Sequence, residues 1–385
     1  MNNSADPHLI RNVCPFGGAA ADLRVDNGVI ACVGTGLKAG NGTDIIDGAG
    51  AIALPGLINA HCHLDKTRFG LSWRPHAAGP DRQSRIDADR ELRREMMSTT
   101  GLRARALALH AYALGTTHMR SHVDVEPEFG LAAVEALLEL RDDLGGAPAI
   151  ELVAFPQFGL VTNPGTADLM EAACRFGCEC VGGIDPSAID GDAPAHLDAV
   201  FGIAERTGAG VDIHLHETGE EGARSMEMIC ARTRALGLQG RVAVSHAFCL
   251  GTVPAARLGG LIEDLAKSDV AVVTYAPGKA PVPPLRDLRA AGVTVAVGTD
   301  GIRDAWTPYG NADMLERAMM LAYRLDYRRD EDIELALDAV MSGGARLMGL
   351  AGHGLGVGAV GPVVLLDAKT LAEAVVTRPP RRVVP

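Results

Sequence analysis

Eight short apolar segments recur along the chain, and the stretches between them have the periodicity of amphipathic helices. The segments are residues 54–60, 116–123, 150–156, 180–184, 211–216, 241–246, 270–275 and 293–298. After a longer first gap they recur every ~25 to 35 residues, which is the length of one β-strand plus one α-helix. Eight such units predict an α/β protein with a (β/α)8 TIM barrel. A doubly wound open sheet is the alternative, and it is disfavoured because no glycine-rich phosphate loop follows any segment.

The two ends of the chain lack this alternation. Residues 1–53 and 355–385 contain short β-like stretches with turn residues between them. Neither end could bury a core alone, so we expect them to pair as a small β-sheet domain beside a barrel over residues 54–354. In the first gap, residues 67–87 contain Pro, Gly and aromatic residues. They predict a long loop over one end of the barrel, and such loops often form lids.

The amino-acid composition argues against nucleic-acid and membrane partners. The chain has 385 residues, 47% of them hydrophobic, and its formal net charge of −12 argues against a nucleic-acid partner. The first residues lack the pattern of a signal peptide, and no apolar run is long enough for a membrane span. Eight scattered cysteines are typical of reduced thiols, and the cluster Cys174, Cys178 and Cys180 is interpreted as packing. We therefore expect a cytoplasmic protein with no membrane partner, and a homo-oligomer stays open.

Histidines gather where the predicted strands end. His61 and His63 follow the first segment with one residue between them, so both point to the same face of a strand. Seven of the twelve histidines lie at the ends of four strands, namely His61, His63, His118, His122, His214, His216 and His246. A structural role is kept for His118 and His216. Together, however, several imidazoles and a carboxylate suit Zn²⁺ or Fe²⁺ with one position left for water.

Several motifs at these strand ends resemble one known superfamily. The segments "HCHLDK", "HLHETGEE", "VSHA" and "VGTDGIRDAW", in this order, look like the amidohydrolase superfamily. The segments "SHVDV", "AFPQFG", "GGIDP" and "DGIRDAWTPYGNADML" resemble its cytosine deaminase branch, which also contains N-isopropylammelide isopropylaminohydrolase. The resemblance extends from about residue 20 to the C-terminus.

The resemblance implies a metal site and a set of roles around it. The implied ligands of one divalent ion, Zn²⁺ or Fe²⁺, are His61, His63, His214 and Asp300. Members with two metals usually bridge them by a modified lysine on the fourth strand, and "VGGIDP" offers none, so one ion is expected. The resemblance also implies that Glu217 donates a proton to the substrate and that His246 contacts the attacking hydroxide. It implies that Gln157 binds a ring carbonyl or amide and that Trp306 borders the pocket.

The chemistry of deamination is compatible with these roles. A divalent metal lowers the pKa of bound water to about 7, so that hydroxide can attack a poorly electrophilic amidine carbon. Asp300 can accept the proton, Glu217 can protonate the ring nitrogen, and His246 can stabilise the tetrahedral oxygen. A salt bridge or a helix cap is the alternative for Glu217, because a helix begins after it. Lys66 either reaches the pocket or pairs with a nearby carboxylate.

The chain also departs from the branch that it resembles. Cytosine deaminase has an acidic residue directly after the metal aspartate, where this chain has Gly301, and His216 also replaces an acidic residue. We expect the glycine to widen the pocket for a substituted ring, with the loop from Phe69 to Gly79, including Trp73, helping to enclose the substrate. The chain stops at "RRVVP", without the further strand usual in the family, which predicts a trimmed small domain.

We therefore predict a mononuclear metal-dependent hydrolase or deaminase. It attacks an amidine or cyclic-amide carbon of a small cytosine-like or triazine-like heterocycle with metal-bound hydroxide, and it releases ammonia or an amine. A hydrolase of the same fold that opens a cyclic amide is the alternative. A non-catalytic scaffold is disfavoured because all the implied ligand and proton-transfer positions are present. Zinc deaminases with a PCxxC motif are excluded, because the sequence contains no such motif.

Overall fold

The barrel is built from eight parallel strands. The computed structural model describes residues 7–79, 81–276 and 278–385. The barrel strands are β6 (Leu57–Cys62), β7 (Thr116–Asp124), β8 (Ala149–Phe155), β9 (Cys180–Ile184), β10 (Gly210–His214), β11 (Val242–Ser245), β12 (Val270–Thr274) and β13 (Val295–Val297). Each strand pairs with the next in chain order. The backbone amide of Asp300, just after β13, donates to the carbonyl of His61 at 2.9 Å, which joins the last strand to the first.

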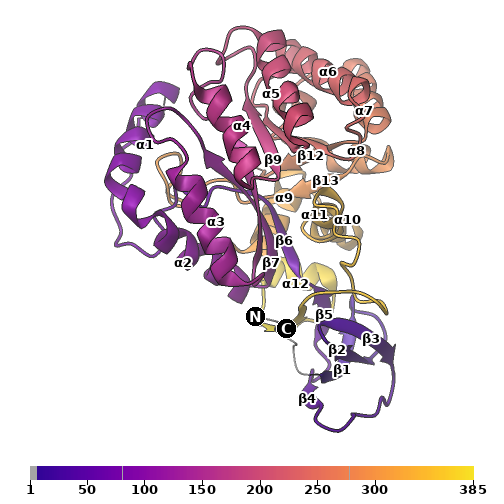
Figure 1. Cartoon of the computed structure of the whole chain (residues 1–385). Coiled ribbons are helices and arrows are strands. Elements are labelled where there is room, and N and C mark those ends of the chain that lie inside the picture. The colour runs from indigo at the N-terminus through magenta and orange to yellow at the C-terminus, as the bar shows by residue number, and fades with distance from the viewer. Residues whose placement is uncertain (1–6, 80, 277) are drawn as a thin grey trace.

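Helices surround the barrel, as Figure 1 shows. The α-helices are α1 (Arg82–Met96), α2 (Thr100–Ala113), α3 (Ala132–Leu144), α4 (Thr166–Phe176), α5 (Ala193–Thr207), α6 (Gly219–Ala235), α7 (Ala255–Ser268), α8 (Leu285–Ala290), α9 (Met314–Arg324), α10 (Asp330–Ala339), α11 (Ser342–Leu347) and α12 (Leu371–Thr377). Among the described residues there are also two 3₁₀ turns, η1 (Met97–Thr99) and η2 (Phe248–Gly251). Across the described part of the chain, no helix is both long and apolar enough to cross a membrane.

A second sheet takes strands from both ends of the chain. Its strands are β1 (His8–Pro15), β2 (Ala21–Asp26), β3 (Val29–Gly34), β4 (Asp44–Asp47), β5 (Ile52–Pro55), β14 (Val363–Leu366) and β15 (Arg381–Val384). The order is β15-β14-β5-β1-β2-β3, with β4 paired to β1. The sheet lies to one side of the barrel in Figure 1 and has its own apolar cluster. The predicted TIM barrel with a small β domain from the chain ends is therefore confirmed.

The first predicted strand, residues 54–60, is wrong in one respect. It is divided at Gly56: β5 pairs with β14 in the small sheet, with Leu54 opposite Val364, and β6 begins the barrel at Leu57. A side chain at Gly56 would collide with Thr117, so the chain passes from one sheet to the other at a point where only glycine fits. The side chain of His353 pairs with the carbonyl of Gly56 at 2.7 Å.

The long loop after β6 is shorter than predicted. We expected a loop over residues 67–87, but α1 begins at Arg82. Asp81 caps this helix, because its carboxylate accepts a hydrogen bond from the backbone amide of Ser84 at 2.9 Å.

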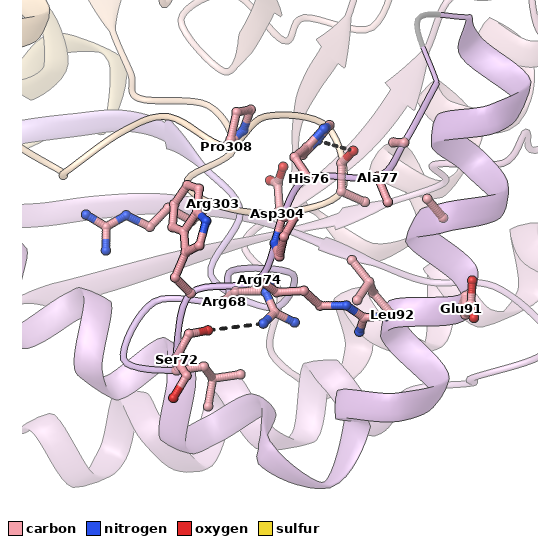
Figure 2. A pocket seen from close by; sticks show the side chains of 16 residues that line it. Arg68, Ser72, Arg74, His76, Ala77, Glu91, Leu92, Arg303, Asp304 and Pro308 are labelled. Atoms are coloured by element: carbon pink, nitrogen blue, oxygen red, sulfur yellow. Dashed lines mark hydrogen bonds between the residues drawn. The ribbon is translucent and has the colours of Figure 1, made fainter.

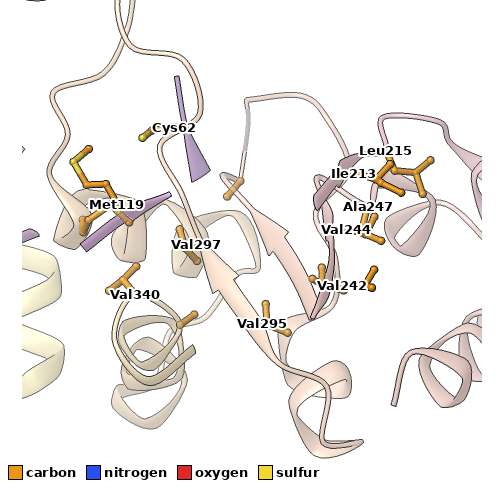
Figure 3. Close-up of a cluster of buried hydrophobic side chains, with 14 of the residues drawn as sticks. Cys62, Met119, Ile213, Leu215, Val242, Val244, Ala247, Val295, Val297 and Val340 are labelled. Atoms are coloured by element: carbon orange, nitrogen blue, oxygen red, sulfur yellow. The ribbon is translucent and has the colours of Figure 1, made fainter. Parts of the chain in front are cut away.

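Alternation along the strands determines what faces the barrel interior. On β10 and β11, Val211, Ile213 and Val244 pack outward in the main hydrophobic cluster, part of which Figure 3 shows. The residues between them point inward: Asp212 pairs in register with Ala243, and His214 with Ser245. A separate interior cluster contains Ala60, Ala243, Ala271, Val273 and Ala296. Small side chains thus leave room inside the barrel for polar ones.

Candidate active site

Four polar side chains meet at the carboxyl ends of three strands. His61 and His63 leave the end of β6, His214 ends β10, and Asp300 follows β13. Candidate ligand atoms of the three histidines lie within 4.8 Å of one another. The Oδ1 atom of Asp300 lies 3.6 Å from Nε2 of His61 and 3.3 Å from Nε2 of His63. The residues that the motifs indicated as ligands are therefore neighbours in space.

The protonation of this group suits a divalent cation. Burial lowers the pKa of His63 and of His214, so both imidazoles are neutral. Burial alone would raise the pKa of Asp300, but the neighbouring imidazoles of His61 and His63 outweigh that effect and hold the pKa well below its usual range. Within the described chain, Nε2 of His61 and both nitrogens of His214 are buried without a partner. Neutral imidazoles with free lone pairs beside a carboxylate are the donor set that Zn²⁺ and Fe²⁺ accept.

His246 lies beside this group. Its ring centroid is 5.0 Å from that of His61 and 4.9 Å from that of His214. Its backbone is left-handed, with φ of 72°, and Asp300 has φ of 58°, which is uncommon for residues other than glycine and often marks functional sites. Burial lowers the pKa of His246, and neither ring nitrogen has a partner in the described chain. The ring is therefore neutral and free to contact a substrate.

His216 stacks on His246 and is itself held by an aspartate. The two rings are 4.2 Å apart at an interplanar angle of 23°. Asp185 accepts a hydrogen bond from the backbone amide of His216 at 2.6 Å and pairs with its Nδ1 at 3.1 Å. This arrangement fixes the orientation of His216, for which the sequence predicted a structural role. His118 lies near the start of β7, whereas the candidate ligands lie at the carboxyl ends of the strands. Its ring contacts the hydroxyl of Thr117 at 3.0 Å.

Glu217 is anchored through both carboxylate oxygens. Oε1 accepts hydrogen bonds from the backbone amides of Ser187 at 2.7 Å and Ala188 at 3.0 Å. Oε2 accepts one from the hydroxyl of Ser225 on α6 at 2.6 Å. The side chain is buried, 5% exposed, and ties the end of β10 to the loop after β9. To donate a proton to a substrate, Glu217 would have to exchange at least one of these bonds.

Lys66 and Gln157 form a pair at the next strand ends. The ammonium of Lys66 donates to Oε1 of Gln157 at 2.6 Å and pairs with Oδ1 of Asp124 at 2.9 Å. Burial alone would lower the pKa of Lys66, but Asp124 and other carboxylates outweigh it and raise the pKa. The lysine is therefore charged and both pairs with a carboxylate and contacts a residue of the predicted pocket. Because the oxygen of Gln157 is occupied, its amide nitrogen is left to donate to another group.

The loop after β13 carries Trp306 and Asp304. Oδ1 of Asp304 accepts hydrogen bonds from the backbone amides of Trp306 at 2.8 Å and Thr307 at 2.9 Å. The indole Nε1 of Trp306 is buried and has no partner in the described chain. A buried indole N–H usually has a partner, so this donor is available to a ligand.

The expectation that Gly301 leaves open space in the pocket is wrong. A Cβ atom at Gly301 would collide with the carboxylate of Asp304, so that carboxylate already fills the space which the glycine was expected to leave open. Burial raises the pKa of Asp304 to about 7. The chain therefore keeps a carboxyl group near Asp300, supplied by Asp304, which comes three residues after Gly301.

A cavity opens beside this loop. It lies between the loop after β6, helix α1 and the loop after β13, and its space, including the part open to solvent, is about 830 Å³. Trp73 and Asp304 are among the residues that line it. Figure 2 shows His76, whose Nε2 contacts the carbonyl of Ala305 at 3.0 Å, and the amide of Arg68 donates to the carbonyl of Arg303 at 2.8 Å. The loop from Phe69 to Gly79 thus packs against the segment that carries Trp306. Trp73 itself is 71% exposed.

Two residues of the site region were missed from the sequence. Tyr275 directly follows β12, and its ring is 5.3 Å from that of His246 in an edge-on orientation. Its position at a strand end was the signal that could have identified it. Arg317 lies on α9 and is only 7% exposed. Burial lowers the pKa of Arg317, while Glu316, Asp300 and Tyr275 act against that change, and no strand-end pattern indicates such a residue.

The comparisons with known proteins agree on one family. Residues 98–384 match the model of the amidohydrolase family. N-isopropylammelide isopropyl amidohydrolase of Pseudomonas sp. (strain ADP) is 31% identical over 351 residues, which cover 88% of this chain and 85% of that protein. A crystal structure of N-isopropylammelide isopropylaminohydrolase from Burkholderia multivorans has a TM-score of 0.95 and 48% identity, over 98% of this chain and 96% of the other. A 5-methylcytosine deaminase structure from Klebsiella pneumoniae has a TM-score of 0.85 and 26% identity, over 97% and 94%.

Proposed function

Because the chain belongs to the amidohydrolase family, we propose that it hydrolyses the exocyclic C–N bond of a small oxo-substituted nitrogen heterocycle and releases an amine. The proposed substrate class is an amino-oxo-triazine that carries an alkyl group on its amine, such as N-isopropylammelide. The extent of the similarity to the Burkholderia multivorans enzyme, 48% identity over 98% of this chain, supports this class over cytosine.

The observation that carries the proposal is a group of hydrogen-bond donors at the strand ends, one of which is buried without an acceptor in the described chain. The indole N–H of Trp306 is buried and unpaired in the described chain, and the charged Lys66 occupies the oxygen of Gln157, which leaves the amide nitrogen to face another group. Arg317, only 7% exposed, adds a buried cation near Asp300 and Tyr275. Leaving such groups unpaired is costly, so a matching substrate presents several acceptors. An oxo-triazine offers a second carbonyl oxygen and more ring nitrogens than cytosine does.

One divalent ion is the proposed cofactor. His61, His63, His214 and Asp300 would hold it, and when bound it supplies a Lewis acid that lowers the pKa of water to about 7. A further group of neighbouring candidate ligands, His63, Asp65 and Asp124, is already neutralised by protein cations. Lys66 and Arg93 pair with Asp124 at 2.9 and 2.5 Å. This supports one ion rather than two.

The side chains divide the proton transfers among them. The oxygen of water adds to the ring carbon, the bond to the exocyclic nitrogen breaks, and that nitrogen leaves as an amine with one more proton. Asp300 is the proposed acceptor of the water proton, because its carboxylate stays ionised. Glu217 is the proposed donor to the ring nitrogen, which makes the carbon more electrophilic. His246, neutral and unpaired, is the proposed partner of the developing oxyanion.

Substrate profiling tests the proposal. Metal-loaded protein is incubated with N-isopropylammelide, ammelide, cytosine and 5-methylcytosine, and amine or ammonia release is measured together with product mass. We expect the highest kcat/KM for the N-alkylated triazine. A preference for cytosine over all triazines would refute the substrate class. A product heavier by one water, with no amine released, would instead indicate a ring-opening hydrolase.

A further inference from the structure

A buried chain of hydrogen bonds crosses the barrel interior below the candidate ligands. Nδ1 of His61 lies 2.9 Å from the hydroxyl oxygen of Ser245 on β11. That hydroxyl donates to Oδ1 of Asp212 on β10 at 2.7 Å. Oδ2 of Asp212 accepts from Arg120 on β7 at 3.0 Å. All four side chains are at most 5% exposed.

We propose that Asp212 is a positioning residue that, through Ser245 and with Arg120 as its anchor, fixes which ring nitrogen of His61 faces the active site. This inference rests on the proposed role of His61 as a metal ligand. Asp212 is not one of the four proposed ligands, although its carboxylate also lies near His61 and His122 in a second group of candidate ligand atoms. It acts by ordering the protons along the chain of hydrogen bonds.

Proton counting determines the tautomer. Arg120 has only donors and faces Oδ2, and an ionised carboxylate has only acceptors, so the single proton of Ser245 points to Oδ1 of Asp212. The hydroxyl oxygen can then only accept from His61, which places the imidazole proton on Nδ1. The other nitrogen, Nε2, keeps its lone pair. That atom is the one without a partner, 3.6 Å from Oδ1 of Asp300.

Arg120 keeps the carboxylate in one orientation. Besides Asp212, it donates to Glu151 on β8 at 2.9 Å and to the carbonyl of Leu347 at 3.4 Å. The guanidinium is therefore held at three points and cannot rotate away from Asp212 without losing bonds in a buried environment. Outer hydrogen bonds of this kind orient histidine ligands, and their loss typically weakens metal binding by about 10 to 100-fold.

The substitution Asp212→Asn distinguishes positioning from packing, because it preserves shape and changes only the donor pattern. Arg120 still requires an acceptor, so the amide oxygen of the asparagine would face the guanidinium and its NH₂ group would face Ser245. The hydroxyl of Ser245 would then accept from the amide and donate to Nδ1 of His61. The proton of His61 would move to Nε2, which removes the lone pair that faces the site. An aspartate-to-asparagine change beside a serine protease histidine acts in this way.

The first measurement is the histidine ¹⁵N spectrum of the metal-free protein. The signals of His61 are identified by their loss in His61→Gln. We expect the Nδ1–H tautomer in the wild type, the Nε2–H tautomer in Asp212→Asn and a mixture in Ser245→Ala. In the Ser245→Ala background, Asp212→Asn should have no further effect on the tautomer, because the bridge is missing.

The second measurement is the zinc affinity from competition with a chelator. We expect it to fall about 10 to 100-fold in Asp212→Asn and also to fall in Ser245→Ala. Ser268→Ala is the matched control, because Ser268 is equally buried but lies on α7 outside the barrel, and it should keep wild-type affinity.

Two results would overturn the inference: an Nε2–H tautomer of His61 in the wild type, or an unchanged tautomer in both variants. If Asp212→Asn does not fold, Ser245→Ala alone decides the matter. If the tautomers change as expected but the wild type binds no metal, the proposed function fails while the positioning role of Asp212 stands.

Discussion

Asp304 should make the stability of the protein fall as the pH rises from about 4 to about 7. Burial raises the pKa of its carboxyl from 3.8 to about 7 in the folded protein. Between these values the unfolded chain releases the proton and the folded chain retains it, so the free energy of unfolding decreases by about 1.4 kcal/mol per pH unit. Below pH 4 both states are protonated, and above pH 7 both are ionised. The whole window therefore corresponds to about 4 kcal/mol.

The substitution Asp304→Asn removes this titration and keeps an acceptor for the amides of Trp306 and Thr307. Urea unfolding of the metal-free wild type and variant at pH 4.5 and pH 8 isolates the contribution, since other titrating groups cancel in the difference. We expect the wild type to lose about 3 kcal/mol relative to the variant over this range. A difference that stays constant within about 0.5 kcal/mol would show that Asp304 is ionised throughout and that burial does not raise its pKa.

Three further changes test the site. Elemental analysis should find about one equivalent of metal in wild-type protein supplied with Zn²⁺, and His214→Ala should lose it. Full metal content in the variant would show that His214 is not a ligand. Glu217→Gln should lower kcat by about 10²-fold or more with unchanged metal content, whereas near-normal turnover would mean that its bonds to Ser187, Ala188 and Ser225 are its only role. Gly301→Ala should destabilise the protein by about 1 to 3 kcal/mol in urea unfolding, because the added methyl collides with Asp304, and wild-type stability would show that the loop relaxes freely.

The sequence predicted the barrel and the family correctly for a physical reason. Each repeated strand and helix unit has a similar length, so apolar strand segments recur at regular intervals in the sequence. Side chains at positions i and i+2 of a strand point to the same face, which brings His61 and His63 together. The division at Gly56 was missed because apolar residues continue on both sides of Pro55 and Gly56. These two residues can mark the start of a strand as well as a break, and the contact with Thr117 shows that the sheets separate here.

The error at Gly301 has a different origin. Counting along the chain shows only that the residue after Asp300 has no side chain. In the structure, the carboxylate of Asp304 lies where a side chain at Gly301 would be. The loop bends back to this point because Asp300 and Arg303 both adopt left-handed backbone angles, with φ of 58° and 49°. Arg317 was missed for a related reason, since its burial depends on how α9 packs and not on any local pattern.

The direct connection from β5 to β6 couples the small sheet to the proposed active site. One uninterrupted peptide runs from the pairing with Val364 to the strand that ends at His61 and His63. Arg381 on β15 adds a second link, because it donates to the carbonyl of Leu114 at 3.2 Å and to Asp313 at 2.8 Å, both outside the small sheet. Excising the terminal strands to obtain a minimal barrel would therefore leave the first catalytic strand without its anchor. Recombination between relatives should accordingly exchange both chain ends together with β6, never one end alone.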